Sequence, residues 1–482
     1  MPPNRRRARG AFRAVVLALL LAMPAVSQDS DDKKRIAELE RRIDELDRRL
    51  QAAEARVAVN TSMMAAPTPP PPARTDAGAT LRNHGAEGAI SIDALKSTAI
   101  ATADASGFAL KSSDGNYLLK IGADLQTDVR TFTGGGSSSL TDQILLRRVR
   151  PTFTGTIYRY VDFFFRPDFG QGTTSIYDAY AQLNYVPRLQ VRVGKFKPPV
   201  GLERLQSDDD TTFVERGLPT LLAPSRDIGI QLGGDIVKRR VAYQLGVFNG
   251  VPDNSLSDAS ATSHRSYAGR VFATPFQTDG ESPLSGLGFG LAAEGGSLDG
   301  IALPAYKTVG QNTFFSFNPG VVSAGHRTAL APQAYYYVGP FGVLAEDTIS
   351  EEQFQKGAVR KDVAFRAWQV EGSYILTGER KGFTGPTPRH PFNLANHGWG
   401  AWELAARIGN FRADKGLFGY GFADPTKSPR ELREWLGGMN WYLNRLVRIS
   451  VDYGHTNFVG GAVSADRAAE RVILARFQIN FI

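Results

Sequence analysis

Apolar and polar residues alternate through most of this chain, in segments of about ten residues that begin near residue 116. Successive side chains of a β-strand point to opposite faces, so this alternation gives each strand one apolar and one polar face. Roughly sixteen such segments are present, which is typical of a transmembrane β-barrel. We therefore predict an all-β fold in which residues 113–482 form a transmembrane antiparallel barrel of roughly sixteen strands.

The predicted strands cover most of this region. They lie near residues 116–131, 144–158, 161–169, 175–185, 189–197, 228–237, 240–249, 266–274, 286–295, 326–338, 340–349, 363–377, 399–410, 431–443, 446–457 and 470–482. Alternation also assigns faces to individual residues. On the second strand, Val149, Phe153 and Ile157 should contact lipid; on the fourth, Tyr177 should point toward lipid and Asp178 toward the lumen.

The connections between these strands alternate in length, as expected for a barrel with short periplasmic turns and long outer loops. The short turns include 159–160, 186–188 and 238–239, whereas the connections 133–143 and 198–227 are long. One long connection, 378–397, falls on the side of the short turns. It is either a genuine inserted turn or a sign that the strand count is off by one.

The residues before the barrel have other patterns. Residues 1–27 combine basic residues, a short apolar run and an A-x-S sequence, which predicts a signal peptide; a membrane anchor would need roughly 18 apolar residues. In residues 28–59 apolar positions are alternately three and four apart, which predicts a coiled-coil helix, although a solvated helix without a partner is an alternative. The proline-rich residues 60–112 are expected to form a periplasmic linker.

Composition and charge exclude several function classes. The formal net charge is +8, but five arginines lie in the predicted signal peptide, so the remainder is too weakly basic for a nucleic-acid partner. The absence of cysteine excludes disulfides and thiol chemistry. The six histidines occur outside any recognisable catalytic motif, so no enzymatic activity, cofactor or metal site is expected.

Several segments carry a resemblance to a known family. They are LLRRVRPTFTGTIYRYVDFFFRPDF at 145–169, LQVRVGKFKPPVGLER at 189–204, VEGSYILTGER at 370–380 and WELAAR at 402–407. From about residue 115 to its end, the chain resembles the phosphate-selective porin O and P family. The resemblance implies a trimeric porin with this strand number, conducting anions, phosphate in the best-known members, along a path lined by basic side chains.

An anion pore needs several cationic groups along one wet path, none of which binds so tightly that the ion cannot leave. Arginine suits this role because its planar fork matches oxyanions and stays protonated. Alternation places one set of arginines toward the lumen: Arg130, Arg148, Arg150, Arg166, Arg192, Arg407, Arg448 and Arg476. Nearby acids such as Asp128, Asp168 and Glu371 support the alternative that each arginine stiffens the barrel wall by ion pairing.

The third outer loop, 198–227, is the best candidate for a constriction, because it is long and densely charged. Its candidate residues are Arg204, Asp208, Asp209, Asp210, Arg216 and Arg226. An aspartate triplet at the narrowest point would repel phosphate, so the simplest interpretation is a solvated turn at the loop tip. A divalent ion bound by the triplet, or a pore without anion selectivity, remain open alternatives. Lys195 and Lys197 fall on the apolar face and are expected to reach toward lipid headgroups.

Together these patterns predict an outer-membrane porin that passes small inorganic anions, phosphate among them, by passive diffusion. Its expected partners are outer-membrane lipid and two further copies of the chain in a homotrimer. One alternative is a general-diffusion porin without phosphate preference. Another is an envelope tether whose coiled coil binds a cell-wall partner.

Overall fold

The computed structural model describes residues 41, 99–104, 107–133, 140–260, 262–277, 282–463 and 465–481. The chain divides into two units, Met1–Ile90 and Ser91–Ile482. The predicted signal peptide, and all of the predicted coiled coil except the helical residue Arg41, lie outside the described residues, as does the linker up to residue 98. The account below therefore concerns the second unit.

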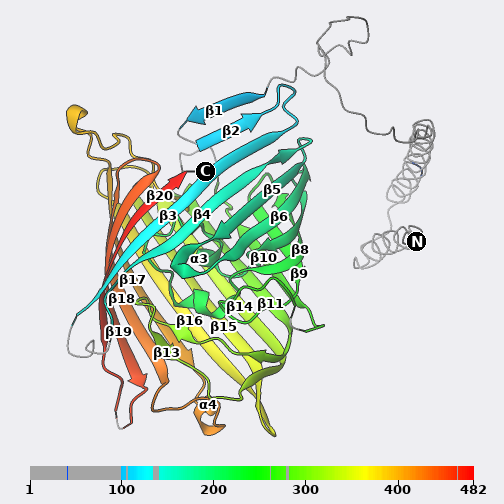
Figure 1. Cartoon of the computed structure of the whole chain (residues 1–482), viewed down its shortest axis with the longest axis vertical. Helices are drawn as coiled ribbons and strands as arrows, with labels where there is room; N and C mark the ends of the chain where they lie inside the picture. The colour runs from blue at the N-terminus through cyan, green and yellow to red at the C-terminus, as the bar shows by residue number, and fades with distance from the viewer. Residues whose placement is uncertain are drawn as a thin grey trace, which may run out of the picture. The chain divides into compact units, whose positions relative to one another are not determined.

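Sixteen antiparallel strands form a closed barrel in this unit (Figure 1). They are β3 (Leu118–Phe132), β4 (Gln143–Ile157), β5 (Val161–Asp168), β6 (Ser175–Val186), β7 (Leu189–Phe196), β8 (Asp227–Ile236), β9 (Val241–Phe248), β10 (Ser266–Ala273), β11 (Leu287–Ala302), β14 (Val322–Val338), β15 (Phe341–Lys356), β16 (Val359–Ile375), β17 (Ala401–Ala413), β18 (Pro429–Tyr442), β19 (Val447–Gly460) and β20 (Glu470–Phe481). β20 closes the barrel by pairing with β3, from Val472 opposite Phe132 to Phe481 opposite Ala123. Closure satisfies the backbone groups that lipid could not, and it confirms the predicted barrel.

Each predicted segment overlaps one of these strands. The largest differences are at the long-loop end, where β11 continues to Ala302 and β15 to Lys356. The added residues of β15 include the polar run Ser350–Gln353, in which Glu351 is exposed and Gln353 half-buried. A hairpin that projects beyond the hydrocarbon needs no apolar outer face, so the alternation ends before the strand does.

Two pairs of strands lie outside the sixteen. β1 (Ile100–Asp104) and β2 (Gly107–Lys111) form a hairpin whose second strand pairs with the first residues of β3. Phe108 of β2 lies opposite Ile121, next to the point where β20 ends, and its ring packs 6.1 Å from that of Phe481. The hairpin therefore extends the barrel wall at the end where β3 begins (Figure 1).

Within a long loop, β12 (Tyr306–Lys307) and β13 (Thr313–Phe315) form the second extra pair. The described residues also form short helical turns. These turns are η3 (Gly170–Gly172), α3 (Leu202–Leu205), η4 (Leu218–Leu222), η5 (Pro283–Gly286), η6 (Leu394–Asn396) and α4 (Gly416–Gly419). No helix in the described ranges is long and apolar enough to span a bilayer.

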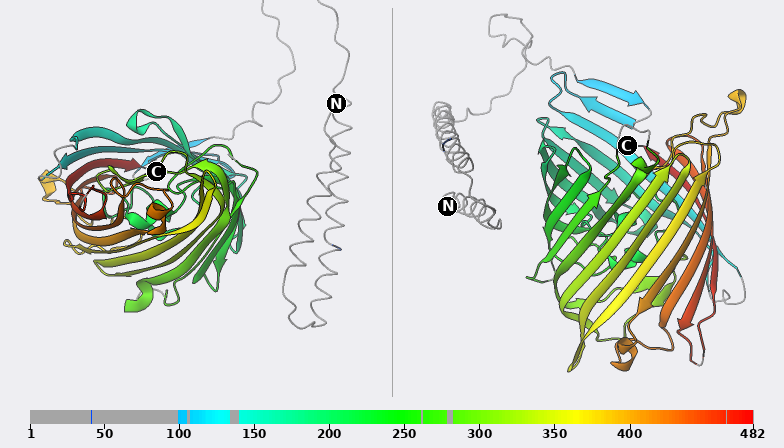
Figure 2. Two further views of the ribbon diagram at one scale, coloured as in Figure 1. Left: turned by 90° about the horizontal axis from the view of Figure 1, so that it is seen from below. Right: turned by 180° about the vertical axis from the view of Figure 1, so that it is seen from behind.

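Short turns and long loops lie at opposite ends of the barrel (Figures 1 and 2). The connection between β16 and β17 lies with the short turns, because Lys381 N donates a hydrogen bond to the oxygen of Gly339 in the β14–β15 turn, at 2.8 Å. The strand register was therefore correct. Residues 378–397 are a genuine insertion at the short-turn end.

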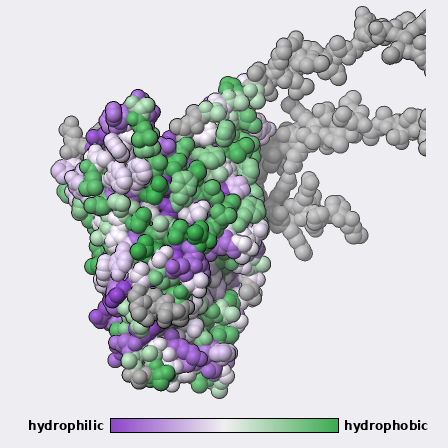
Figure 3. Space-filling view, turned by 60° about the vertical axis from the view of Figure 1, so that its left-hand side comes forward, coloured by the Kyte–Doolittle hydropathy of each residue, from purple (hydrophilic) through white to green (hydrophobic). Residues whose placement is uncertain are grey.

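The outer wall of the barrel is apolar and its interior is largely polar. Exposed residues include Ile230, Leu245 and Val271, at 55%, 58% and 53% of full exposure, and Figure 3 shows hydrophobic side chains across the wall. The interior also holds an apolar cluster near the long loops, in which Phe314 and Phe315 pack on Phe411 of β17. The long loop between β11 and β14 is thereby anchored inside the barrel mouth.

Candidate ion pathway

The third long loop folds into the lumen, and residues 197–226 are called the inner loop below (Figures 1 and 2). Pro198 and Pro199 end β7 because proline has no N–H to offer the sheet. Gly201 then adopts φ 80°, a conformation that favours glycine, and the chain turns inward. Val200 and Leu202 on either side of it are fully buried.

The inner loop is attached to the far wall of the barrel by its backbone. The amide of Val214 donates to Asp452 of β19 at 2.7 Å, and the oxygen of Thr212 accepts from Asn440 of β18 at 2.8 Å. At Gly217 the loop approaches β16 so closely that an added Cβ would lie 1.4 Å from Oε1 of Gln369. These contacts fix the loop across the lumen, as expected for a constriction.

Glu215 of the inner loop binds guanidinium groups from the wall. Arg147 donates to its two carboxylate oxygens at 2.8 and 3.1 Å, and Arg130 donates at 3.3 Å. Arg476 lies 3.7 Å away and forms a two-pronged ion pair with Asp128 at 2.7 and 2.8 Å. One loop carboxylate thus joins β3, β4 and β20.

Asp208 has the corresponding role on the other side of the inner loop. It accepts from Arg150 of β4 at 2.5 Å and from Arg216 of the loop itself at 2.6 Å, and Arg148 lies 3.7 Å away. Arg150 also donates to Asp168 at 2.7 Å. The contact with Arg150 therefore ties the loop to β4, and the contact with Arg216 braces the loop internally.

Both carboxylates belong to the inner loop and lie outside the spanning strands. Burial alone would raise the pKa of Asp208, but Arg148, Arg216 and Arg150 outweigh it and hold that pKa well below its ordinary value. Burial opposes ionisation of Glu215 in the same way, and the charge and hydrogen bonds of Arg147 lower its pKa overall. Both groups are ionised at neutral pH.

The aspartate triplet is not a solvated loop tip. Asp208 and Asp209 retain only 3% and 7% of their exposure, and Asp210 accepts a hydrogen bond from the amide of Gly385 at 2.8 Å. Asp209 accepts from Ser207 and Gln126 at 3.1 and 3.5 Å. The expectation was wrong because protein groups replace water around all three acids: arginines bind Asp208, and neutral donors bind Asp209 and Asp210.

The eight predicted lumen arginines divide into two groups. Ion pairs are formed by Arg130, Arg148, Arg150, Arg407 and Arg476, with Arg407 lying 3.5 Å from Glu434 and 3.8 Å from Glu203. Within the described part of the chain, Arg166, Arg192 and Arg448 form no ion pair. Arg166 donates to Thr152 at 2.9 Å, and Arg448 to the oxygen of Thr211 at 2.8 Å.

The remaining inner-loop arginines hold the loop itself. Arg204 donates to the oxygen of Thr220 and to Asn254, the latter at 2.7 Å. Arg226 pairs with Asp178 of β6 at 3.0 Å. Arg204 and Arg226 therefore secure the end of the loop where the chain returns to β8.

Two lumen residues escaped the alternation analysis because β-bulges shift the side-chain register. Between Gln126 and Thr127 the pairing of β3 with β4 shifts, and Arg147 as well as Arg148 reaches the lumen. A second shift, between Arg166 and Pro167, turns Tyr177 inward instead of toward lipid. Its ring centre lies 3.7 Å from the guanidinium carbon of both Arg150 and Arg226.

The two lysines expected near headgroups are held by protein groups instead. Lys195 is 3% exposed and its Nζ lies 2.6 Å from Asp258 of the following long loop. Lys197 donates to the oxygen of Gln206 inside the inner loop at 2.7 Å. The strand pattern failed for Lys197 because β7 ends at Phe196.

A cavity of about 270 Å³ lies between the inner loop and the β4–β6 wall. Five arginines and one lysine line it against three carboxylates. Its charged lining residues are Arg147, Arg148, Arg150, Arg204, Arg216, Lys307, Asp168, Asp208 and Glu215. The lining therefore carries a net positive charge, and several guanidinium groups are available to one passing anion.

The chain is similar to several known outer-membrane proteins. Porin O of Pseudomonas aeruginosa is 23% identical over 371 residues, which cover 72% of this chain and 84% of that protein. The outer-membrane channel DcaP of Acinetobacter baumannii shares the fold with a TM-score of 0.50 at 10% identity, over 77% of this chain and 99% of that one. The trimer form of OmpT of Vibrio cholerae aligns with a TM-score of 0.47 at 11% identity, over 76% and 99%.

A family model covers nearly the whole barrel. The model for phosphate-selective porin O and P matches residues 119–481, from the second residue of β3 to the last residue of β20. The match includes the inner loop and every arginine that lines the 270 Å³ cavity between this loop and the barrel wall. The chain belongs to the phosphate-selective porin O and P family and is an outer-membrane porin.

Proposed function

We propose that this porin conducts small anions by passive diffusion past the inner loop. The observation that carries the proposal is the excess of six cationic over three anionic side chains around the 270 Å³ cavity. Cations from both β4 and the inner loop line that space, so an entering anion is attracted to it.

The ion pairs do not use up the hydrogen-bonding capacity of these arginines. A guanidinium group has five N–H donors. Arg148 donates one recorded hydrogen bond, to Oε1 of Gln126 at 2.5 Å, and its Nε has no hydrogen-bond partner in the described structure. Arg148 can therefore bind an oxyanion while Asp208, 3.7 Å away, limits how tightly the ion is held.

Phosphate is the anion that the family description suggests, and we include it among the transported solutes. Its tetrahedral oxygens match the planar donor forks of arginine. The alternative is a general-diffusion pore, which is favoured by the carboxylates of Asp208 and Glu215 in the same lining.

The test is the reversal potential of the purified full chain in a planar bilayer under a salt gradient, followed by competition with phosphate. We expect an anion-selective potential and a chloride current that phosphate reduces. Replacing Arg148 and Arg150 together by alanine should reduce the anion preference several-fold, because two lining charges are lost. The control is Arg366→Ala, since Arg366 is 59% exposed by side chain and pairs with Asp347 on β15. A cation-selective potential unaffected by phosphate would refute the proposal.

Export and assembly are part of the same proposal. Residues 1–27 would direct export, residues 28–59 would form a periplasmic coiled coil, and three chains would assemble in the outer membrane. The mass of the detergent-solubilised protein, measured with and without residues 28–59, tests the assembly. A mass corresponding to one chain in both cases would contradict the trimer, and a trimer that forms without these residues would leave the coiled coil free for a cell-wall partner.

A further inference from the structure

Six side chains form a second polar band on the wall from β6 to β14, nearer to the short-turn end. They carry only amide or guanidinium groups. They are Gln182, Arg192, Gln231, Gln244, Arg270 and Gln333. Strand register makes them neighbours: Arg192 lies opposite Gln182 and Gln231, and Gln244 lies opposite Arg270. This group is called the amide–arginine band below.

Neither arginine of the band is neutralised. Nε of Arg192 donates to Oε1 of Gln182 at 2.7 Å, and Nε of Arg270 donates to Oε1 of Gln333 at 2.9 Å. Among the residues that the structure describes, no carboxylate lies within 4.0 Å of either guanidinium group. The outer N–H groups of Arg192 and Arg270 therefore remain available to an anion, unlike those of the arginines that hold the inner loop.

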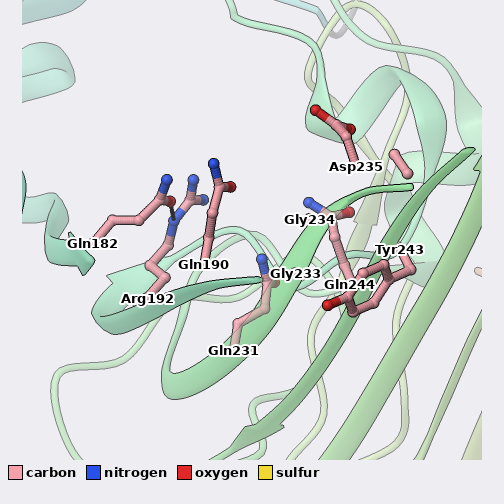
Figure 4. Close-up of a pocket in the computed structure, with 10 residues that line it drawn as sticks. Gln182, Gln190, Arg192, Gln231, Gly233, Gly234, Asp235, Tyr243 and Gln244 are labelled. Atoms are coloured by element: carbon pink, nitrogen blue, oxygen red, sulfur yellow. Dashed lines mark hydrogen bonds between the residues drawn. The ribbon is translucent and has the colours of Figure 1, made fainter. Parts of the chain in front are cut away.

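The glutamines of the band supply buried polar atoms that lack partners. Gln231 is 5% exposed, and Oε1 of both Gln231 and Gln244 has no hydrogen-bond partner in the described structure. Both side chains line a cavity of about 90 Å³ that also contains Arg192, Gln190 and one carboxylate, that of Asp235 (Figure 4). An unpaired buried polar atom is costly, and a half-turn of either side-chain amide brings its N–H groups to this space, where they can donate to a carboxylate.

A row of aromatic side chains adjoins the band. Phe164 and Tyr180 are stacked, with ring centres 5.4 Å apart, and Tyr180 packs 5.9 Å from Phe196. The guanidinium carbon of Arg192 lies 4.5 Å from the centre of the Tyr180 ring and 5.4 Å from that of Phe196. The cationic group of Arg192 and the apolar faces of these rings therefore lie next to each other.

A cavity of about 330 Å³ combines both features, because its lining includes Phe164, Tyr180, Arg192 and the cationic Lys120. The lining contains one carboxylate, Asp162, whose oxygens accept hydrogen bonds from Thr156 and Asn184. The net charge of the lining is positive. A ligand that fits it carries a negative charge at one end and a flat apolar body at the other.

We propose that the amide–arginine band and the adjoining aromatic row form a binding site for small aromatic monocarboxylates. The carboxylate binds the N–H groups of Arg192, the amides of Gln231 and Gln244 take its remaining hydrogen bonds, and the ring packs on Tyr180 and Phe164. Inorganic phosphate has no ring and therefore gains no binding energy from the aromatic row. This inference rests on the proposed anion conduction and adds a substrate class to it.

The experiment is blockade of chloride current through the full chain in a planar bilayer, with sodium benzoate as the probe. Acetate lacks the ring and benzamide lacks the charge, so each isolates one half of the site. We expect benzoate to block at a concentration about tenfold lower than either, since a charge-assisted hydrogen bond and a ring contact each contribute roughly tenfold or less. Phosphate should block no better than acetate at this site.

Two variants and a matched control locate the effect. Arg192→Gln should raise the blocking concentration of benzoate about tenfold, and Tyr180→Leu roughly threefold to tenfold. Arg188→Gln removes the same charge from the exposed β6–β7 turn outside both cavities, and should leave blockade unchanged. Slower migration of heated than of unheated protein in detergent gels confirms that each variant is folded.

The outcomes separate this site from the proposed function. An anion-selective pore in which benzoate and acetate block equally, or in which R192Q behaves like R188Q, overturns the site and leaves anion conduction intact. A cation-selective or non-conducting protein overturns the proposed function instead. Calorimetric titration of benzoate into detergent-solubilised protein then decides the site independently of current, and undetectable heat at millimolar benzoate overturns it as well.

Discussion

At the scale of single residues, Glu215 is the inner-loop group on which the most wall charges depend. It binds Arg147 and Arg130 and lies 3.7 Å from Arg476, so its loss leaves Arg147 without its carboxylate partner and weakens the pairing of the other two. We predict that Glu215→Gln lowers the free energy of unfolding by about 3 kcal/mol and shifts the reversal potential further toward anions. Urea titration in detergent and bilayer recording measure the two effects.

A carboxylate on the outer face serves as the control for this prediction. Glu351 is exposed on β15, and Glu351→Gln removes the same charge without touching the lumen. Its reversal potential should match that of the unmodified protein. A Glu215→Gln protein with unchanged selectivity would show that Glu215 acts only as a structural group.

Asp208 provides a residue-scale test of pH dependence. Its pKa in the folded protein lies below its ordinary value because of Arg148, Arg216 and Arg150, although burial opposes them. A depressed pKa means that the carboxylate stabilises the fold above the unfolded pKa of about 4 and that this stabilisation disappears as pH falls below it. The stability difference between the unmodified protein and Asp208→Asn should therefore be constant from pH 7 to 5.

The same comparison at lower pH completes the test. By pH 3 the difference in free energy of unfolding between the two proteins should have become smaller, because the unfolded chain binds a proton at Asp208 while the folded chain keeps this carboxyl ionised. A difference that grows on acidification would mean that ionised Asp208 destabilises the fold.

At the scale of elements, the inner loop should control the width of the pore. Replacing residues 203–216 with a short Gly-Ser linker removes Glu215 and Asp208 together with the backbone contacts to Asp452 and Asn440. We predict a several-fold rise in single-channel conductance and, because the removed segment carries five acids against two arginines, a larger anion preference. Removing residues 394–396 from the insertion at the other end, where Leu394 is 73% exposed, should change neither quantity.

The strands were predictable from the sequence because alternation records an environment that differs on the two faces of each strand. The bulges were not predictable. One inserted residue moves all the following side chains of the strand to the opposite faces, and the sequence itself carries no mark of the insertion. Arg147 and Tyr177 became lumen residues in this way. Their positions depend on pairing with the neighbouring strand, which a single sequence does not display.

The path of the inner loop was predictable only in part. Its length and charge marked it as a constriction candidate, but its burial depends on partners far away in the chain, such as Glu203 with Gln369 and Val214 with Asp452. The same dependence explains why the aspartate triplet was wrongly predicted to be a solvated turn. From the sequence alone, a loop rich in charged residues is expected to be solvated, because its partners in the barrel wall lie far away in the chain.

At the scale of the whole molecule, closure between β3 and β20 is what makes the barrel possible, and the absence of cysteine makes closure testable. Val129 of β3 lies opposite Ala475 of β20, so the Cβ atoms of cysteines at these positions would lie about 5 Å apart, close enough for small strand movements to allow a disulfide. We predict that mild oxidation crosslinks the double variant within one chain and that the denatured product migrates faster until it is reduced. Cysteines at Val129 and Val451 form the control, because β19 pairs with β18 and β20 and not with β3 among the described strands. Equal crosslinking of both pairs, or of neither, would contradict closure at this seam.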